Sequence, residues 1–199
     1  MSQHDDGGPA TLPPLTLEAA ARQVGAFAWI ERRCFEIIGS WVPAVPEPEP
    51  KLRLGEDAYH HAWHAELWTG RLPKLRELAA EDFVAAPGPA VAALLDAVAA
   101  PTGTDQTIEK LVGIYRVLLP RKIAAYEAHG RTLSPLTDGP TERARSLVVH
   151  DERADWHRGE LLVQSLLTTP ERVERASRHQ AALETLVVAA GGLMTPPAP

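Results

Sequence analysis

The chain has 199 residues, of which 45% are hydrophobic and 23% are charged. This length and composition predict one globular domain with a substantial core, and they exclude a fibrous or fully disordered protein. The net charge is −6 and the sequence has no long run of Lys or Arg, so we expect no nucleic-acid partner. Cys34 is the only cysteine, which excludes a disulfide framework and favours a cytoplasmic location.

Both ends of the chain are rich in glycine and proline. Residues 1–14 lack the apolar stretch of a signal peptide, and residues 191–199 finish in Thr-Pro-Pro-Ala-Pro. We expect both ends to be disordered tails that flank one helical-bundle domain at 15–190. No apolar stretch approaches the roughly 20 residues of a membrane helix, so we expect no membrane partner.

The first half of the domain has helical rather than strand periodicity. A first helix is expected from about Thr16 to Val42, and a second from about Leu52 to Leu78 with a kink at Pro73. Residues 43–50 predict a stiff polyproline-like connector between them. The inward face of the first helix is expected to consist of Val24, Ala28, Glu31, Cys34, Phe35, Ile38 and Val42.

Residues 81–100 are rich in alanine and are interrupted by Pro-Gly-Pro, which predicts a crossover with a short helix. A third long helix is expected after a cap at Thr104 or Asp105, with a bend at Pro120. Its inward face includes Tyr115 and Tyr126.

The last part of the domain predicts two more helices. Pro140 fits the first position of a fourth long helix that reaches about Leu167, and Thr169-Pro170 starts a terminal helix that ends near Ala190. The expected fold is therefore all-α: an antiparallel four-helix bundle with a short crossover helix and an extra C-terminal helix. An apolar face on the terminal helix is compatible with a homodimer and consists of Ala182, Leu183, Leu186 and Val187.

Glu31 is the first candidate functional residue, because it lies at the centre of an otherwise apolar face. A buried carboxylate must be paired, metal-bound or protonated, since an isolated buried charge is costly. The alternative interpretation is a purely structural pair between Glu31 and an Arg or His of another helix.

Two segments rich in Trp and His, 59–68 and 150–161, are predicted to face each other inside the bundle. In the first, His60 and His64 stand one helical turn apart, as do His61 and His64, so either pair could bind one cation from one helix face. The inward face favours His61, with His64 on its flank. Core histidines held only by hydrogen bonds are the alternative. In the second, the predicted inward face carries His150, Asp151 and His157, while Glu152 and Asp155 are expected at the sides, in solvent.

Three further side chains have structural interpretations that we favour. Tyr115 and Tyr126 are expected to be core residues with their hydroxyls at the rim, the alternative being hydrogen bonds into the interior. Cys34 is expected to be a small core residue rather than a nucleophile.

This arrangement resembles the ferritin-like superfamily. A central Glu in helix one, metal-ligand residues in helix two, a crossover and an acidic, His-bearing fourth helix match that topology over about 15–167. The resemblance implies a bundle that holds a divalent metal such as iron through Glu and Glu-x-x-His ligands. Glu31, His64 and His157 match its first Glu and two His positions. The sequence departs from the pattern at His61 and Ala154, where the motif has glutamates.

A second resemblance is to DinB-like bundles, which bind one divalent metal through three side chains. The segment His157-Arg158-Gly159-Glu160 is similar to their His-Arg-Gly-Gln, and 61–68 is similar to their second helix. Arg153 stands where a further ligand is expected.

Two functions follow as hypotheses. The first is a metal-dependent oxidoreductase or oxygenase acting on a small organic molecule, with Glu31, His61 and His157 as catalytic residues. Its divalent metal, for example iron, would be held by Glu31, His61, His64, His150, Asp151 and His157. The second is a non-catalytic, metal-free bundle that dimerises or binds a protein partner.

Overall fold

The structure is a computed structural model, in which residues 15–74 and 79–194 are described. Every regular element within these ranges is helical, which confirms the all-α prediction. The elements are α1 (Leu17–Trp41), α2 (Pro48–Thr69), the 3-10 helix η1 (Ala80–Phe83), α3 (Pro89–Ala99), α4 (Thr107–Val112), the π-helical turn η2 (Gly113–Leu118), α5 (Leu119–Gly130), α6 (Gly139–Leu166) and α7 (Pro170–Ala190). The tail expected at 1–14 and residues 195–199 of the tail expected at 191–199 lie outside the described residues. The expectation of disorder was wrong for the start of the second tail, because Leu193 is 3% exposed and belongs to the core.

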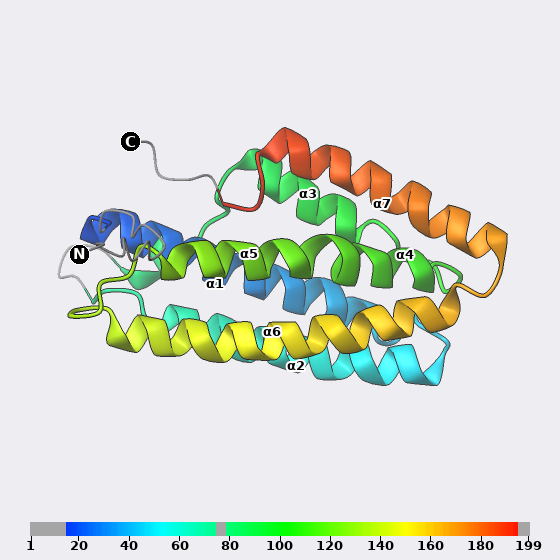
Figure 1. Cartoon of the computed structure of the whole chain (residues 1–199), viewed down its shortest axis with the longest axis horizontal. Helices are drawn as coiled ribbons and strands as arrows, with labels where there is room; N and C mark the ends of the chain where they lie inside the picture. The colour runs from blue at the N-terminus through cyan, green and yellow to red at the C-terminus, as the bar shows by residue number, and fades with distance from the viewer. Residues whose placement is uncertain (1–14, 75–78, 195–199) are drawn as a thin grey trace, which may run out of the picture.

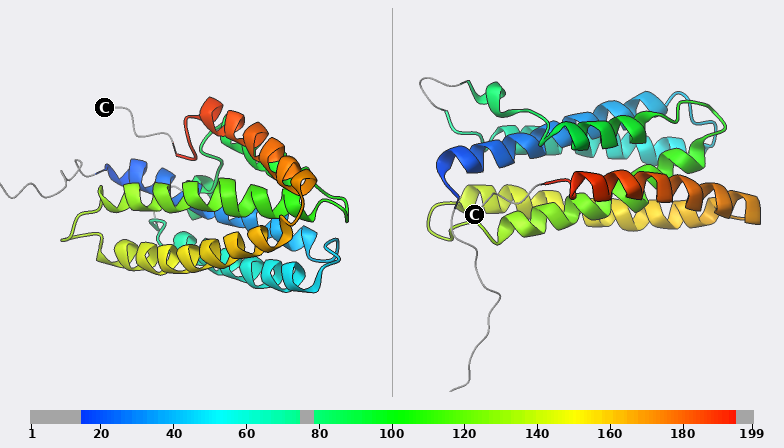
Figure 2. Two further views of the ribbon diagram at one scale, coloured as in Figure 1. Left: turned by 45° about the vertical axis from the view of Figure 1, so that its right-hand side comes forward. Right: turned by 90° about the horizontal axis from the view of Figure 1, so that it is seen from above.

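Four long helical stretches lie side by side along the length of the molecule (Figure 1). They are α1, α2, the continuous run from α4 through η2 to α5, and α6. The chain runs in one direction in α1 and α6 and in the other in α2 and α4–α5, and both views of Figure 2 agree with this arrangement. The crossover that contains η1 and α3 returns the chain from the end of α2 to the start of α4, and α7 packs on α3 and α4.

The core consists of two apolar clusters with a polar layer between them. One cluster contains residues such as Cys34, Ala58 and Leu118, and the other contains Phe27 and Trp68. On each of the four long stretches, buried polar residues lie between the residues of the two clusters, and these are Glu31, His61, His64, Lys122, Glu152 and Asp155. The four long stretches thus place their buried polar side chains in one layer between the two apolar clusters.

Helix α1 agrees with the bounds expected from the sequence. Thr16 caps it, accepting a hydrogen bond from the backbone N–H of Ala19 at 3.2 Å. The face prediction was right for Glu31 and Cys34, which are fully buried, but wrong for Phe35, which is 45% exposed. Phe35 follows Cys34 directly and is therefore turned by about 100° from the buried face.

Helix α2 is displaced toward the N-terminus relative to the prediction. It begins at Pro48 rather than near Leu52, because proline is tolerated in the first turn, where its missing N–H has no intrahelical partner. It ends at Thr69, so Pro73 follows the helix and does not kink it. The expected continuation to Leu78 includes residues 75–78, which lie outside the described residues.

A glycine contact fixes the crossover against α1. A Cβ at Gly25 would lie 1.9 Å from the carbonyl oxygen of Phe83, which is closer than two non-bonded atoms can approach. The absence of a side chain at Gly25 lets η1 lie directly on α1.

The third stretch contains a π-helical turn rather than a simple proline bend. It begins at Thr107, after the expected caps at Thr104 and Asp105, and the N–H of Leu119 reaches back five residues to the carbonyl of Ile114. Pro120 has no N–H to donate. The guanidinium of Arg121 instead donates to the carbonyls of Arg116 and Val117, at 3.0 and 3.2 Å.

Helix α6 begins at Gly139, one residue before the predicted Pro140, and α7 begins at Pro170 as predicted. Thr169 caps α7. The apolar face of α7 was expected to be exposed, but Leu183 and Val187 are buried in the chain's own core, with residues of α3 such as Leu94. These two residues are therefore already covered within the chain, while Leu186 is partly buried and Ala182 is exposed. The homodimer stays a prediction.

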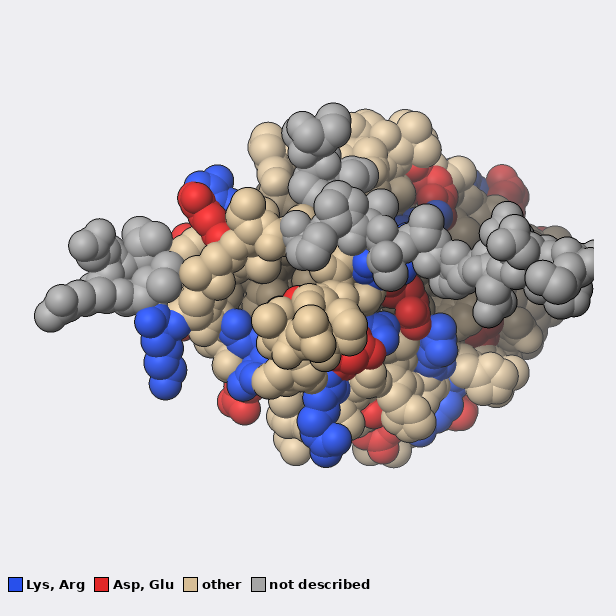
Figure 3. Space-filling model, turned by 60° about the vertical axis from the view of Figure 1, so that its left-hand side comes forward, with Lys and Arg blue, Asp and Glu red and all other residues tan. Residues whose placement is uncertain are grey.

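Charges of both signs are interspersed on the face shown in Figure 3. Within the described ranges, no helix combines the length and the apolar character that crossing a membrane requires.

Candidate functional site

The polar layer is built around a buried lysine. Lys122 of α5 reaches the centre of the bundle, where its Nζ lies 2.8 Å from Oε2 of Glu31, 2.7 Å from Oε1 of Glu152 and 3.0 Å from Nδ1 of His61. These residues, together with His64, form what we call the central cluster. All five are at most 1% exposed, so water does not screen their charges.

The opposite charges within the central cluster stabilise one another. Burial alone would raise the pKa of Glu31 and Glu152, but the Lys122 ammonium and the His61 ring outweigh burial and lower both pKa values. Burial and Lys122 would lower the pKa of His61, yet the two carboxylates raise it to about 9. The protonated His61 ring donates to Glu31 over 2.7 Å. Two carboxylates are thus balanced by two cations.

His64 is held more loosely than His61. Its Nδ1 lies 3.3 Å from Oε1 of Glu152, and its Nε2 lies 3.3 Å from Oδ2 of Asp151. The side chain of Asp151 is 25% exposed, so this contact leads from the central cluster toward the surface of α6.

Two neighbouring groups complete the surroundings of the central cluster. The hydroxyl of Tyr126 donates to Oε1 of Glu31, and burial raises the pKa of Tyr126 well above its usual value. Burial also raises the pKa of the Cys34 thiol to about 12, so it stays protonated and is a poor nucleophile, as predicted.

Two buried polar atoms of the central cluster have no hydrogen-bond partner among the described residues. They are Nε2 of His61 and Oε2 of Glu152. Unpaired polar atoms in a protein interior commonly mark a bound water or ion.

A second polar group lies about one helical turn from the first and repeats its composition. Asp57, His60 and Asp155 form this edge cluster, and Arg53 bridges the two aspartates. The Tyr115 hydroxyl donates to Asp57, whose pKa is raised because burial and Asp155 outweigh Arg53.

The edge cluster differs from the central cluster by reaching solvent. The side chain of His60 is 27% exposed, and its Nδ1 lies 2.7 Å from Oδ2 of the buried Asp155. Arg158, on the surface of α6, also binds Asp155, at 2.7 Å.

The structure brings together only part of the predicted site. Glu31, His61 and His64 meet in the centre, and Asp151 contacts His64 from the edge. The other two predicted ligands, His150 and His157, are exposed on α6.

The sequence prediction chose the wrong face of α6 as the inward one. The buried side of α6 carries Val148, Glu152, Asp155, Gly159 and Leu162, whereas the predicted face was displaced from it by about one residue. The two acids expected in solvent are therefore the ones that enter the core. The tyrosine hydroxyls also differ from the favoured interpretation, because both point into the interior.

Lys122 and Arg53 were missed, since lysine and arginine are usually exposed. A signal for Lys122 exists in the sequence. It lies seven residues after Tyr115 and four before Tyr126, which is the spacing of one helix face.

Glu31, His61, His64 and Glu152 could hold a metal ion, because one ligand atom from each lies within 4.8 Å of all the others. Carboxylate and imidazole ligands suit iron, manganese or zinc. The Lys122 ammonium, however, already lies within hydrogen-bond distance of three of these residues. A metal at the same point would be repelled by it, so the residues do not fit a two-metal centre of the ferritin-like type.

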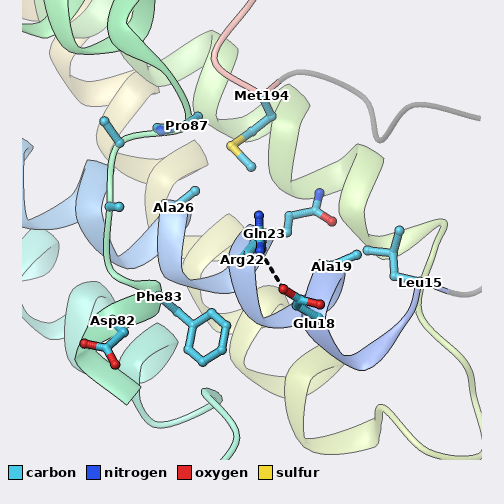
Figure 4. Close-up of a pocket in the computed structure, with 12 residues that line it drawn as sticks. Leu15, Glu18, Ala19, Arg22, Gln23, Ala26, Asp82, Phe83, Pro87 and Met194 are labelled. Atoms are coloured by element: carbon cyan, nitrogen blue, oxygen red, sulfur yellow. Dashed lines mark hydrogen bonds and ion pairs between the residues drawn. The ribbon is translucent and has the colours of Figure 1, made fainter. Parts of the chain in front are cut away.

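The hollows of the molecule lie away from the central cluster. One, of about 570 Å³, lies between the start of α1, Phe83, Pro87 and Met194 (Figure 4). Another, of about 720 Å³, lies on α2 beside Tyr59 and His60. Neither is lined by a residue of the central cluster, so neither brings a substrate to Lys122.

A scan against protein-family models and searches of curated proteins and solved structures gave no match to this chain. The functional argument therefore depends on the geometry of its own residues.

Proposed function

We propose that this chain is a non-catalytic, metal-free helical bundle of ferritin-like topology, which acts by binding a partner at its surface. The order of chain directions, with a long crossover between the second and third stretches, supports the topology. The observation that carries the functional proposal is the position of Lys122 Nζ, 2.7–3.0 Å from Glu31, Glu152 and His61.

The ammonium supplies the positive charge that a metal would otherwise supply. Two buried carboxylates need a compensating cation, and Lys122 with the protonated His61 provides it from within the chain. Arg53 does the same for Asp57 and Asp155. In this proposal the central cluster serves to fix the pairing of the helices, and binding takes place at the surface.

The outer face of α2 and α6 is the surface that we favour for a partner. Leu52 and Tyr59 are about 70% exposed, and Leu161 is 54% exposed. Leu52 lies in two adjoining grooves, one lined by Tyr59 and the other by Leu161, so the three side chains form one apolar patch.

Metal analysis tests this proposal. The protein is expressed without a His tag in medium supplemented with iron, manganese and zinc, and its metal content and thermal unfolding are measured with and without chelator. We expect far less than one equivalent of metal and no effect of the chelator on the melting temperature. Near-stoichiometric metal that is lost in His64→Ala would overturn the proposal.

A metal-dependent oxidoreductase acting on a small organic molecule is the second candidate. The unpaired Nε2 of His61 and Oε2 of Glu152 favour it, because they are buried polar atoms that an ion or a water can satisfy. Lys122→Ala separates the two functions. If the lysine replaces the metal, this variant gains affinity for divalent ions, whereas Lys110→Ala, which removes another buried lysine, does not. A wild-type protein that already binds metal supports the second candidate.

A further inference from the structure

The groove beside His60 combines an oriented imidazole with cationic and apolar walls. It has a volume of about 720 Å³. Its lining residues are Val42, Lys51, Leu52, Gly55, Glu56, Tyr59, His60 and Arg158. The central cluster contributes none of them.

The orientation of His60 is set from inside the protein. Its Nδ1 lies 2.7 Å from Oδ2 of Asp155, whose side chain is only 2% exposed and is itself held by Arg53 and Arg158. Because Asp155 holds Nδ1, Nε2 is the ring nitrogen that remains for a ligand in the groove.

The charges on the groove walls select the ligand's charge. Arg158 and Lys51 contribute positive charge, and Arg158 keeps donors beyond the one that binds Asp155. Glu56 also lines the groove, where it pairs with Arg53 at 3.0 Å and adds one negative charge to the lining. A singly charged carboxylate fits this balance better than a dianionic phosphate.

We propose that this groove binds a small organic acid that carries a hydroxyl group beside its carboxylate. The hydroxyl donates to Nε2 of His60, the carboxylate accepts from Arg158, and an apolar or aromatic body lies against Leu52 and Tyr59. This inference goes beyond the proposed function and does not depend on whether the central cluster holds a metal.

Three related probes test the proposal by NMR titration of the whole chain. Mandelate has the aromatic body, the hydroxyl and the carboxylate. Phenylacetate lacks the hydroxyl, and benzyl alcohol lacks the carboxylate. We expect saturable binding of mandelate at the resonances of His60 and Tyr59, and binding about tenfold weaker for each of the other two probes.

Two variants assign the contacts. His60→Leu is expected to remove the preference for mandelate over phenylacetate, and Arg158→Met to remove the preference for mandelate over benzyl alcohol. His150 and Arg153, which are exposed on α6, provide the controls His150→Gln and Arg153→Met. Both controls should keep both preferences. Because Arg158 is on the surface, Arg158→Met keeps the test valid even if His60→Leu fails to fold.

Other results would overturn the inference. No saturable shift with any probe, or a hydroxyl preference that survives in folded His60→Leu, contradicts it. Sedimentation in parallel shows whether a second copy of the chain covers the groove. A dimer that dissociates in Leu52→Asp and is unaffected by mandelate would make the groove an interface between copies instead.

Discussion

The central and edge clusters have the same chemistry and differ in their access to solvent. Each joins carboxylates from two helices to histidine and one basic side chain, Lys122 in the centre and Arg53 at the edge. In the central cluster the charged side chains are buried from solvent and paired with opposite charges. In the edge cluster, by contrast, His60 lines a groove at the surface. The comparison shows that burial decides which polar group can only hold the fold and which can meet a ligand.

Removing the central cation should have the largest effect. We expect Lys122→Met to lower the free energy of unfolding by about 3–5 kcal/mol, because it leaves the buried Glu31 and Glu152 short of one positive charge. Urea denaturation measures the change. Lys110→Met is the control, since Lys110 is also a buried residue but its ammonium makes a part-buried hydrogen bond to the carbonyl of Gly103, and about 1–2 kcal/mol is expected there. Equal losses in the two variants would contradict a special role for Lys122.

The second prediction concerns the support of the edge cluster. A Cβ at Gly159 would lie 2.0 Å from the ring of Tyr115, whose hydroxyl binds Asp57. Gly159→Ala is therefore expected to cost about 2–4 kcal/mol through overpacking and loss of that hydrogen bond. Gly55→Ala, at a helical position with no described neighbour within 4 Å, should instead stabilise by up to about 1 kcal/mol. Chemical denaturation of both variants decides the point.

A third prediction contrasts two buried histidines. Unlike His61, His129 packs against the rings of Phe27 and Trp68, and burial and Arg145 lower its pKa from 6.5 to about 4. His129 thus stays neutral in the folded protein while the unfolded chain takes up a proton below pH 6.5. The contribution of His129 to stability should be complete above pH 6.5, fall as the pH drops from 6.5 toward 4, and level off below about 4.

His129→Gln tests this assignment. In the wild type we expect His129 to account for about 2 kcal/mol of the stability lost between pH 7 and 5, and the variant should lack this part of the pH dependence. Denaturation midpoints measured across that range give the comparison. An unchanged slope in the variant would assign the pH dependence to other groups.

The smallest expected effects come from the two tyrosine hydroxyls. Tyr115→Phe and Tyr126→Phe should each cost about 1–2 kcal/mol, because each removes a buried hydrogen bond to a carboxylate. The loss should be larger for Tyr115→Phe, since Glu31 keeps Lys122 and His61 as partners while Asp57 keeps mainly Arg53. Denaturation curves of the two variants measure which loss is larger. A larger loss for Tyr126→Phe would contradict the prediction, because it would show that Lys122 and His61 do not compensate Glu31 for the lost hydroxyl.

The sequence was sufficient to predict the helices and one part of the site. Glu31 could be found because it is the single charge on an apolar face, and His61 because it shares a face with apolar neighbours. The face of α6 could not be chosen in the same way, because acids occupy both candidate faces and the two histidines lie on the exposed one. Glu152 was judged by its charge, while its burial depends on Lys122, which lies on another helix and leaves no sign in the local periodicity of α6.

The π-helical turn and the proline after it determine how far Lys122 is rotated into the bundle. The widened turn at Gly113–Leu118 changes the angular offset between the residues before and after it, and Pro120 cannot supply the donor that a regular helix would use there. Pro120→Ala should stabilise a regular α-helical turn relative to the π-helical one, and this change would rotate Lys122 away from Glu31 and Glu152. The chain's internal counter-ion is thus positioned by a backbone irregularity, and a one-residue deletion nearby would misplace it as effectively as mutating the lysine itself.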